Sequence, residues 1–152
     1  MKTNLLILVL SLTVLVCPGC VTKEPHPTPQ QLTFDQLSSN PKQYNGRDII
    51  IDGFYFQGFE VVVLSENLVY SGYAQGHLVP EGTIIWIEGG IPKEVYDSLY
   101  EQHMMGPSER YGKIRIRGKF EFVEKFGHLG QYDYQIIPFE VELLPWFPPA
   151  QQ

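Results

Sequence analysis

The strongest constraint on the fold is a strict alternation of side-chain type between Gly112 and Phe122. Side chains of a β-strand point to opposite faces in turn, so this pattern predicts a strand with one buried and one exposed face. One face carries Ile114, Ile116, Gly118, Phe120 and Phe122, and the other carries Lys113, Arg115, Arg117, Lys119 and Glu121. The chain must therefore contain a sheet that buries an apolar face.

Four more segments have the composition of strands. In the first of them, Ile49, Ile51 and Tyr55 share one face. The stretch 71–80 between the second and third segments is rich in glycine and polar residues, which is typical of a loop. We expect the last strand to be broken at Pro138, because proline has no N–H to donate to a neighbouring strand. These four segments are 47–57, 59–64, 82–87 and 132–144.

Two helical segments complete the secondary structure. The first covers 33–38, where Thr33 suits an N-cap and Phe34 and Leu37 lie on one face. The second covers 92–105, between the third and fourth strands. Five strands with a helix in this place are the layout of an OB-fold barrel. We therefore predict an all-β chain with minor helices, folded as a five-stranded, OB-like Greek-key barrel.

Residues 1–20 have the pattern of a secretory segment. The apolar run from Leu5 to Val16 has the length of a signal-peptide core and is too short for an ordinary membrane-spanning helix. It leads to Cys20, which directly follows the small residue Gly19. This arrangement resembles the lipobox of bacterial lipoproteins, and the resemblance implies cleavage between these two residues and lipid on the cysteine. The alternatives are a plain secretory signal and an uncleaved anchor.

The lipobox resemblance also implies an address in the bacterial cell envelope. Acyl chains contribute roughly 0.8 kcal/mol per buried CH₂, so two or three of them on Cys20 give effectively permanent attachment to a membrane. Val21 is not the retention Asp of the enteric pattern, which favours the outer membrane, or the outer face of the cell membrane where there is only one. The predicted organisation is a signal peptide (1–19), a lipidated cysteine with a proline-rich tether (20–31), one OB-like domain (32–147) and a tail (148–152).

Composition restricts the partners. The full chain has 11 basic and 17 acidic residues, and loss of Lys2 with the signal peptide leaves 10 against 17, a net charge of about −7. A negative surface repels nucleic acid and anionic lipid. Cys17 and Cys20 are the two cysteines of the chain, so the remainder contains neither a disulfide framework nor a cysteine metal site.

The basic face of the 112–122 strand is the feature that favours single-stranded nucleic acid, which OB folds can bind. In the predicted topology, however, this strand lies between the first and the fifth. Their outward positions carry Asp48, Asp52, Glu140 and Glu142. We therefore expect cross-strand ion pairs to neutralise the basic face.

Short motifs along the chain add a second resemblance. They are Tyr44-x-Gly46, Gly58-Phe59-Glu60 and Gly127-His128-Leu129-Gly130. Between Thr33 and Leu144 the sequence resembles a group of small, largely uncharacterised bacterial OB-fold proteins. The resemblance implies a fold and no activity.

The candidate binding residues are Glu60, His128, Leu129 and Trp86. Flanking glycines leave the His128 imidazole accessible, and Glu60 reaches it if the two loops lie at the same end of the barrel. Three interpretations remain open: a structural turn, a contact to a ligand or partner, and a metal site. A metal needs at least three ligands, and His77 and His103 lie in unrelated segments, so we predict no metal and no cofactor.

Enzymatic motifs are absent from the sequence. It has no Gly-x-Ser-x-Gly, no phosphate-cradling glycine-rich loop and no cysteine nucleophile in the mature part. We predict a non-enzymatic, membrane-anchored module that binds an envelope protein through its loops and through the exposed face between the second and third strands. The alternative is a domain that binds a small ligand or glycan through aromatic loop residues, and single-stranded nucleic-acid binding is the third class.

Overall fold

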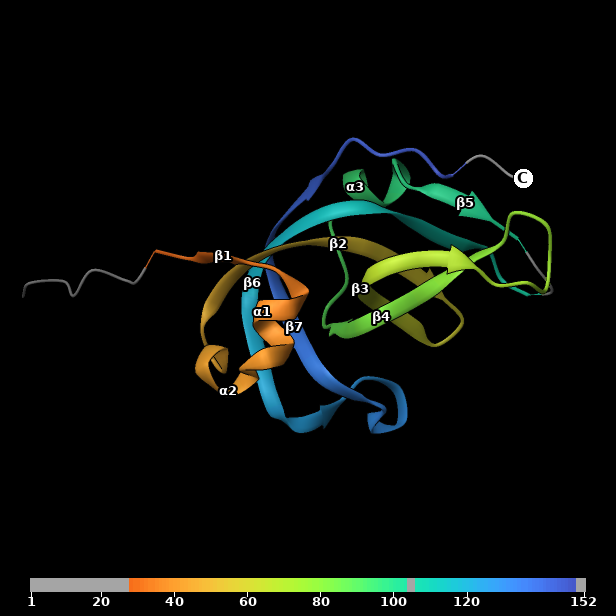
Figure 1. The fold of residues 1–152 in the computed structure, drawn as a ribbon. Helices are drawn as coiled ribbons and strands as arrows, with labels where there is room; N and C mark the ends of the chain where they lie inside the picture. The colour runs from red at the N-terminus through yellow and green to blue at the C-terminus, as the bar shows by residue number, and fades with distance from the viewer. Residues whose placement is uncertain (1–27, 104–105, 150–152) are drawn as a thin grey trace, which may run out of the picture.

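The computed structural model describes residues 28–103 and 106–149, so the predicted signal peptide, Cys20 and most of the tether lie outside the described residues. Strands dominate this part and three short α-helices accompany them, which confirms a mainly β chain with minor helices (Figure 1). None of the described helices has the length and apolar character needed to cross a bilayer. The elements are β1 (Gln30–Leu32), α1 (Phe34–Ser39), α2 (Pro41–Tyr44), β2 (Asp48–Gly58), β3 (Val61–Tyr70), β4 (Leu78–Ile87), α3 (Lys93–Asp97), β5 (Tyr100–Gln102), β6 (Glu109–Phe126), the 3-10 turn η1 (His128–Gly130) and β7 (Tyr132–Leu143).

The described strands form one sheet of seven, in the order β1-β2-β3-β4-β7-β6-β5, and β2 also pairs with β6. This extra pairing closes β2, β3, β4, β7 and β6 into a ring, with the short strands β1 and β5 beside it. Four pairings within the ring are antiparallel. The fifth, between β4 and β7, is parallel and joins only Trp86 with Gln135 and Ile87 with Ile136.

The main core fills the ring and is closed at one end by α1. Thr33 and Gln36 form a reciprocal capping box at the start of this helix, which satisfies two backbone N–H groups that have no partner within the helix. Phe34 and Leu37 then point into the core, as the sequence predicted. The Phe34 ring lies against Gly53 of β2, where an added Cβ would come within 3.0 Å of it. Gly53 thus lets the helix approach the strand closely.

A second, smaller apolar cluster lies on the outer side of the same strands. Phe56 and Val63 belong to it and are buried, although their neighbours Tyr55 and Leu64 face the main core. Trp146 from the C-terminal segment is among the side chains that pack against this cluster. The predicted second and third strands are β3 and β4, and their outward side chains Ile84 and Trp86 are only partly buried, so the binding face expected there stays a prediction.

Several element boundaries differ from the sequence-based prediction. The helix expected over 92–105 is the shorter α3, because the chain turns at Leu99 and continues as β5, paired with β6. The Leu99 side chain is buried against Gly112, where an added Cβ would lie 2.7 Å from it. Within the predicted 71–80 loop, β4 already begins at Leu78.

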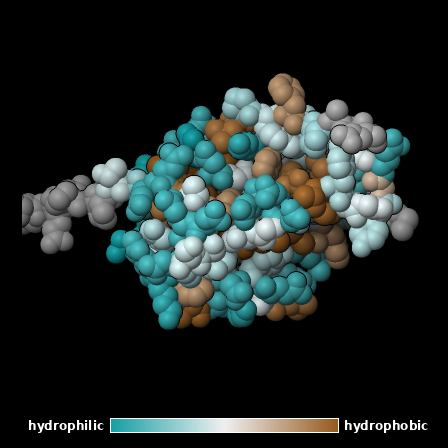
Figure 2. All heavy atoms as spheres, in the orientation of Figure 1, coloured by the Kyte–Doolittle hydropathy of each residue, from teal (hydrophilic) through white to brown (hydrophobic). Residues whose placement is uncertain are grey.

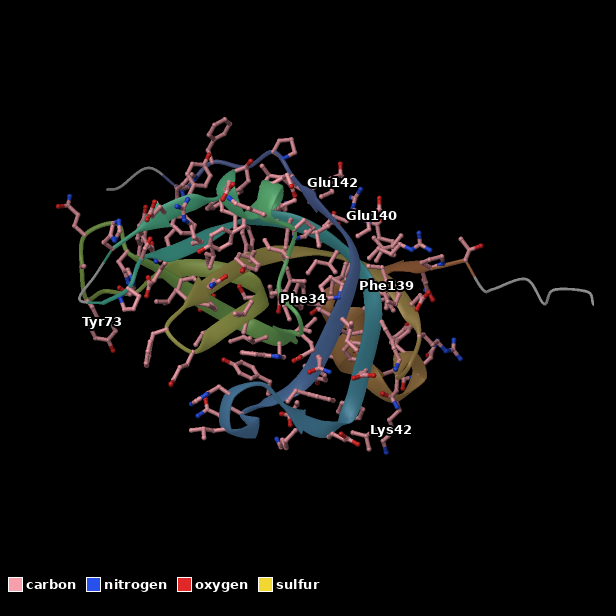
Figure 3. The ribbon with its side chains drawn as sticks, turned by 180° about the vertical axis from the view of Figure 1, so that it is seen from behind. Phe34, Lys42, Tyr73, Phe139, Glu140 and Glu142 are labelled. Atoms are coloured by element: carbon pink, nitrogen blue, oxygen red, sulfur yellow. The ribbon has the colours of Figure 1, made fainter. Side chains whose placement is uncertain are left out.

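The last strand is continuous through Pro138, contrary to the expected break. Pro138 lies opposite Gly118, and the register then shifts so that Arg117 faces Glu140. Phe139 is the extra residue of this bulge, and its side chain is exposed on the rear of the molecule (Figure 3). A bulge accommodates the missing N–H of proline without ending the strand.

The surface is unevenly apolar. In Figure 2, hydrophobic side chains gather in a hollow around β3 and β4, whereas the side near α1 and α2 is mostly hydrophilic. Tyr73, in the loop between β3 and β4, lies at the far end of the molecule from β1, where the described chain begins (Figure 3). The two sides of the molecule therefore differ in surface character.

Candidate functional site

The structure brings two of the predicted site residues into contact. Glu60 lies in the turn between β2 and β3, and His128 begins η1, between β6 and β7. Nε2 of His128 lies 3.1 Å from Oε2 of Glu60, and the two side chains remain 40% and 48% exposed. The two loops therefore do lie at the same end of the ring. We call the four residues Phe59, Glu60, His128 and Leu129 the loop tip.

Apolar side chains flank this ion pair. Phe59 is 70% exposed and Leu129 is 80% exposed, although each is large enough to contribute to a core. Scattered single apolar residues on a surface are ordinary, but here two of them are adjacent in sequence to the two members of one contact. The ion pair thus brings together two loops that each expose a large apolar side chain, and exposed apolar residues of this kind are typical anchors for a partner surface.

The backbone of the loop tip is strained. Glu60 and Leu129 have φ values of 58° and 54°, in the left-handed region that favours glycine. The third described non-glycine residue of this kind is Val123, at φ 112°, in the outer part of β6 that leads to η1. Each such residue costs of order 1–3 kcal/mol, and strain of this type concentrates at functional sites. The strain fixes the direction in which the loop tip presents its side chains.

Trp86 lies beneath the loop tip and supports it. An added Cβ on Gly127 would lie 2.6 Å from the Trp86 ring, so glycine is needed where η1 crosses it. The Trp86 ring packs against Tyr132, with centroids 5.3 Å apart, and its Nε1 donates to Glu88. Burial raises the pKa of the Tyr132 hydroxyl above its ordinary value. Trp86 is thus half-buried and supports the exposed residues of the loop tip from below. It is not itself one of those exposed residues.

Two of the four basic residues on this face of β6, Arg115 and Arg117, make the cross-strand ion pairs that the sequence predicted. Arg115 makes a two-pronged contact with Asp52, at 2.7 and 2.8 Å, and lies 3.7 Å from Glu142. Arg117 lies 3.9 Å from Glu140. The alternating pattern had indicated Asp48 as the ion-pair partner of Lys119. Lys119 pairs instead with Glu121 of its own strand. Acidic neighbours therefore lie along this face, which weakens it as a track for a nucleic-acid backbone.

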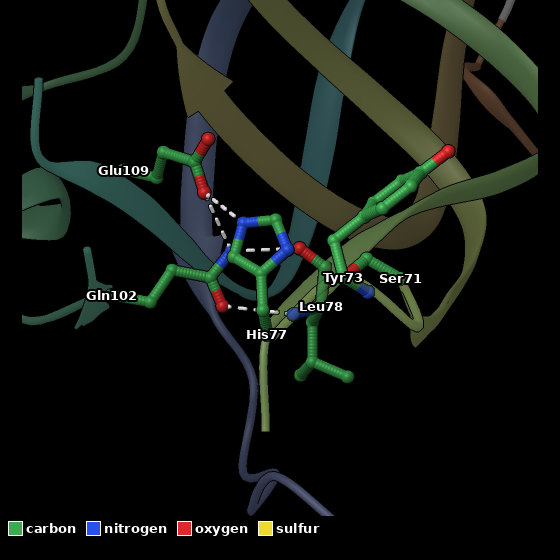
Figure 4. Close-up of polar contacts among 6 residues, drawn as sticks. All are labelled: Ser71, Tyr73, His77, Leu78, Gln102 and Glu109. Atoms are coloured by element: carbon green, nitrogen blue, oxygen red, sulfur yellow. Dashed lines mark hydrogen bonds and ion pairs between the residues drawn. The ribbon is translucent and has the colours of Figure 1, made fainter. Parts of the chain in front are cut away.

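A second histidine site was missed by the sequence analysis (Figure 4). His77 is only 5% exposed, and its Nε2 lies 2.8 Å from Oε2 of Glu109. Its Nδ1 is buried and has no hydrogen-bond partner among the described residues. The two residues are far apart in sequence, so only the pairing of the strands brings them together.

Gln102 completes this group, which we call the buried clamp. Its side-chain amide accepts from the backbone N–H of Leu78 at 3.0 Å and donates to the backbone oxygen of Leu78 at 2.7 Å. The same amide also donates to Glu109 at 2.8 Å. The side chain thus makes the two hydrogen bonds that a neighbouring strand would make with β4 at Leu78. The clamp joins β4 to the paired strands β5 and β6, although β7 lies between β4 and β6 in the strand order.

Neither histidine site has the composition of a metal centre. Across 28–103 and 106–149, no group of three or more His, Cys, Asp or Glu side chains is placed to hold an ion. His103 lies 3.5 Å from Glu101 but is separate from both the loop tip and the buried clamp.

The C-terminal segment packs back onto the ring and remains partly apolar outside. Trp146 packs edge-on against Phe54, with centroids 5.2 Å apart, and its backbone oxygen accepts from the hydroxyl of Tyr100. Phe147 is exposed beside it.

No family model, curated protein or solved structure matches this chain. These comparisons therefore assign no function to the chain.

Proposed function

We propose that this chain is a lipid-anchored, non-catalytic interaction module of the bacterial cell envelope, and that the loop tip contacts a protein partner. The observation that carries the proposal is the pair of exposed apolar residues, Phe59 and Leu129, beside the Glu60–His128 contact. Large exposed apolar side chains on a preorganised backbone supply binding energy with little loss of conformational entropy. The module needs no cofactor or metal for this role.

The fold proposed for this module is an OB-like barrel. The strand order of the ring, β2-β3-β4-β7-β6 and back to β2, supports it, since two later strands are exchanged relative to the chain order. The position of α3 between the third and fourth long strands supports it as well. In such barrels the loops after the first and fourth strands bind ligands, and these are the loops that carry Glu60 and His128.

The membrane attachment is proposed on the sequence at Gly19-Cys20. A tether from Cys20 to the start of β1 would hold the domain near the bilayer and restrict the search for a partner to the envelope, which raises the effective concentration of that partner. The outer membrane is the proposed location where the organism has one. The tether joins β1, while the loop tip lies on β2–β3 and β6–β7, so lipid attachment and partner contact use separate parts of the chain.

Photo-crosslinking in intact cells tests the proposal. A photoreactive residue is placed at Leu129, and a matched probe replaces Tyr73, which is also exposed but lies in a different loop, between β3 and β4. We expect one dominant protein adduct from position 129 and a different pattern from position 73. Cys20→Ala should reduce the adduct by removing the anchor. No adduct, or the same adducts from both positions, would show that the loop tip is not a specific contact site.

A further inference from the structure

The ring opens along one line, between β4 and β7. Their pairing is confined to Trp86–Ile87 and Gln135–Ile136, and towards the beginning of both strands they separate. A groove of about 700 Å³ occupies this seam, within the range of small-ligand sites. Its walls come from β3, β4, β7 and the residue before β7, and they include Glu66, Thr83, Ile84, Gln131, Tyr132 and Tyr134.

The walls of the seam combine flat apolar surfaces with hydrogen-bonding groups. Tyr132 and Tyr134 are both half-buried, and Ile84 lies opposite them across the groove. Oε2 of Glu66 accepts from the backbone N–H of Thr83 at 3.2 Å, which holds the carboxylate at the groove wall. A carboxylate fixed in this way can accept further hydrogen bonds, because it offers about four acceptor positions.

An added β-strand does not suit this seam. At the start of β4, the backbone N–H and oxygen of Leu78 are already hydrogen-bonded to the side chain of Gln102. Pro80 has no N–H to offer, and Gly82 leaves the extended conformation with φ 79°. Natural sheets protect their edges with such features. An extended peptide would therefore find few backbone partners along β4.

Anionic ligands do not suit it either. The described residues that line the groove include the carboxylates of Glu66 and Asp133 and no lysine or arginine. Asp133 pairs with Lys125, whereas Glu66 contacts only the backbone N–H of Thr83 among the described groups. A phosphate or a carboxylate in the seam would face this charge, so the chemistry favours a neutral ligand that donates hydrogen bonds.

We propose that the seam between β4 and β7 binds a neutral saccharide. Sugar rings have one apolar face that packs on aromatic rings, and hydroxyl and acetamido groups that donate to carboxylates. Tyr132 and Tyr134 provide the first kind of contact, and Glu66 and Gln131 the second. The site is distinct from the loop tip and does not rest on the protein-binding role proposed above.

A titration of the full chain in detergent micelles with the tetramer of N-acetylglucosamine tests this proposal. The acetamido group supplies an N–H for Glu66 and a methyl group for Ile84. Because Trp86 packs against Tyr132, binding should produce a saturable change in tryptophan fluorescence. Glu66→Gln keeps an acceptor for Thr83 but loses the charge, and should weaken binding about tenfold, as expected for one charge-assisted hydrogen bond.

Matched variants keep the test decisive. Glu81→Gln makes the same chemical change at an exposed position of β4 that does not line the groove, and should bind like the wild type. If Glu66→Gln does not fold, Gln131→Ala replaces it, because this rim side chain is exposed; it should weaken binding several-fold. Absence of a saturable response, or equal affinity in all variants, would overturn the proposal.

Discussion

Two of the histidine–glutamate contacts among the described residues have almost the same geometry and opposite surroundings. At the buried clamp, His77 and Glu109 are 2.8 Å apart and only 5% and 20% exposed. At the loop tip, His128 and Glu60 are 3.1 Å apart and 40% and 48% exposed. Removing one partner of a buried polar pair leaves the other desolvated, whereas water replaces a lost partner at the surface.

This difference separates the roles of the two sites. The buried clamp holds three strands together and offers no accessible polar atom on the imidazole, since its free nitrogen is itself buried. The loop tip has a strained backbone and presents its side chains to solvent. The contrast indicates that stability depends on the first site and recognition on the second, and each of the following predictions can break or sharpen it.

The largest expected effect is at His77. His77→Ala should lower the free energy of unfolding by about 3 kcal/mol, because it leaves a cavity and takes the partner from a partly buried carboxylate. Urea unfolding of the full chain measures it. His103→Ala is the matched control, since this side chain is exposed, and should leave stability nearly unchanged. A small effect at His77 would mean that the clamp does not stabilise the ring.

Gln102→Ala should have the next largest effect, a loss of about 2 kcal/mol. The variant removes two hydrogen bonds to the backbone of Leu78 and one to Glu109, and leaves the Leu78 groups without a partner. Hydrogen exchange at the Leu78 amide should accelerate more than exchange at Ile85, deeper in β4. Equal acceleration at both amides would indicate global destabilisation instead of opening of this edge.

The alternating pattern of the sequence was sufficient to predict the long strands but not how they end. The core positions of β6 and the short α1 with its cap follow directly from local patterns. The length of α3 does not, because Leu99 is held by its contact with Gly112, a residue distant in sequence. The continuity of β7 through Pro138 could not be predicted either, because the bulge opposite Gly118 depends on how β7 pairs with β6.

The same distinction applies to the two histidine sites. The loop tip was visible because glycines beside His128 and a turn before Glu60 are local signals. The buried clamp was not, because His77, Gln102 and Glu109 have no mutual spacing that indicates contact before the strands are paired.

Leu129→Gly should raise stability by about 1 kcal/mol, since glycine adopts a positive φ without the steric cost that leucine bears. The same variant removes the most exposed apolar side chain of the loop tip, so capture of the proposed partner should fall. A higher midpoint in urea with weaker partner binding would separate the two roles in a single variant. Lower stability would show that the leucine side chain contributes to packing and not to recognition.

The smallest effect on stability is expected for His128→Ala, the surface counterpart of His77→Ala. The change should be no more than about 0.5 kcal/mol, because an exposed ion pair is weakened by water and salt. Urea unfolding at low and high salt measures it, and any difference from the wild type should shrink as salt rises. If the loss instead approached that of His77→Ala, the contact with Glu60 would be holding the β2–β3 and β6–β7 loops in the folded ring. The loop tip would then be a second structural clamp, and the proposal that its exposed residues bind a partner would lose its support.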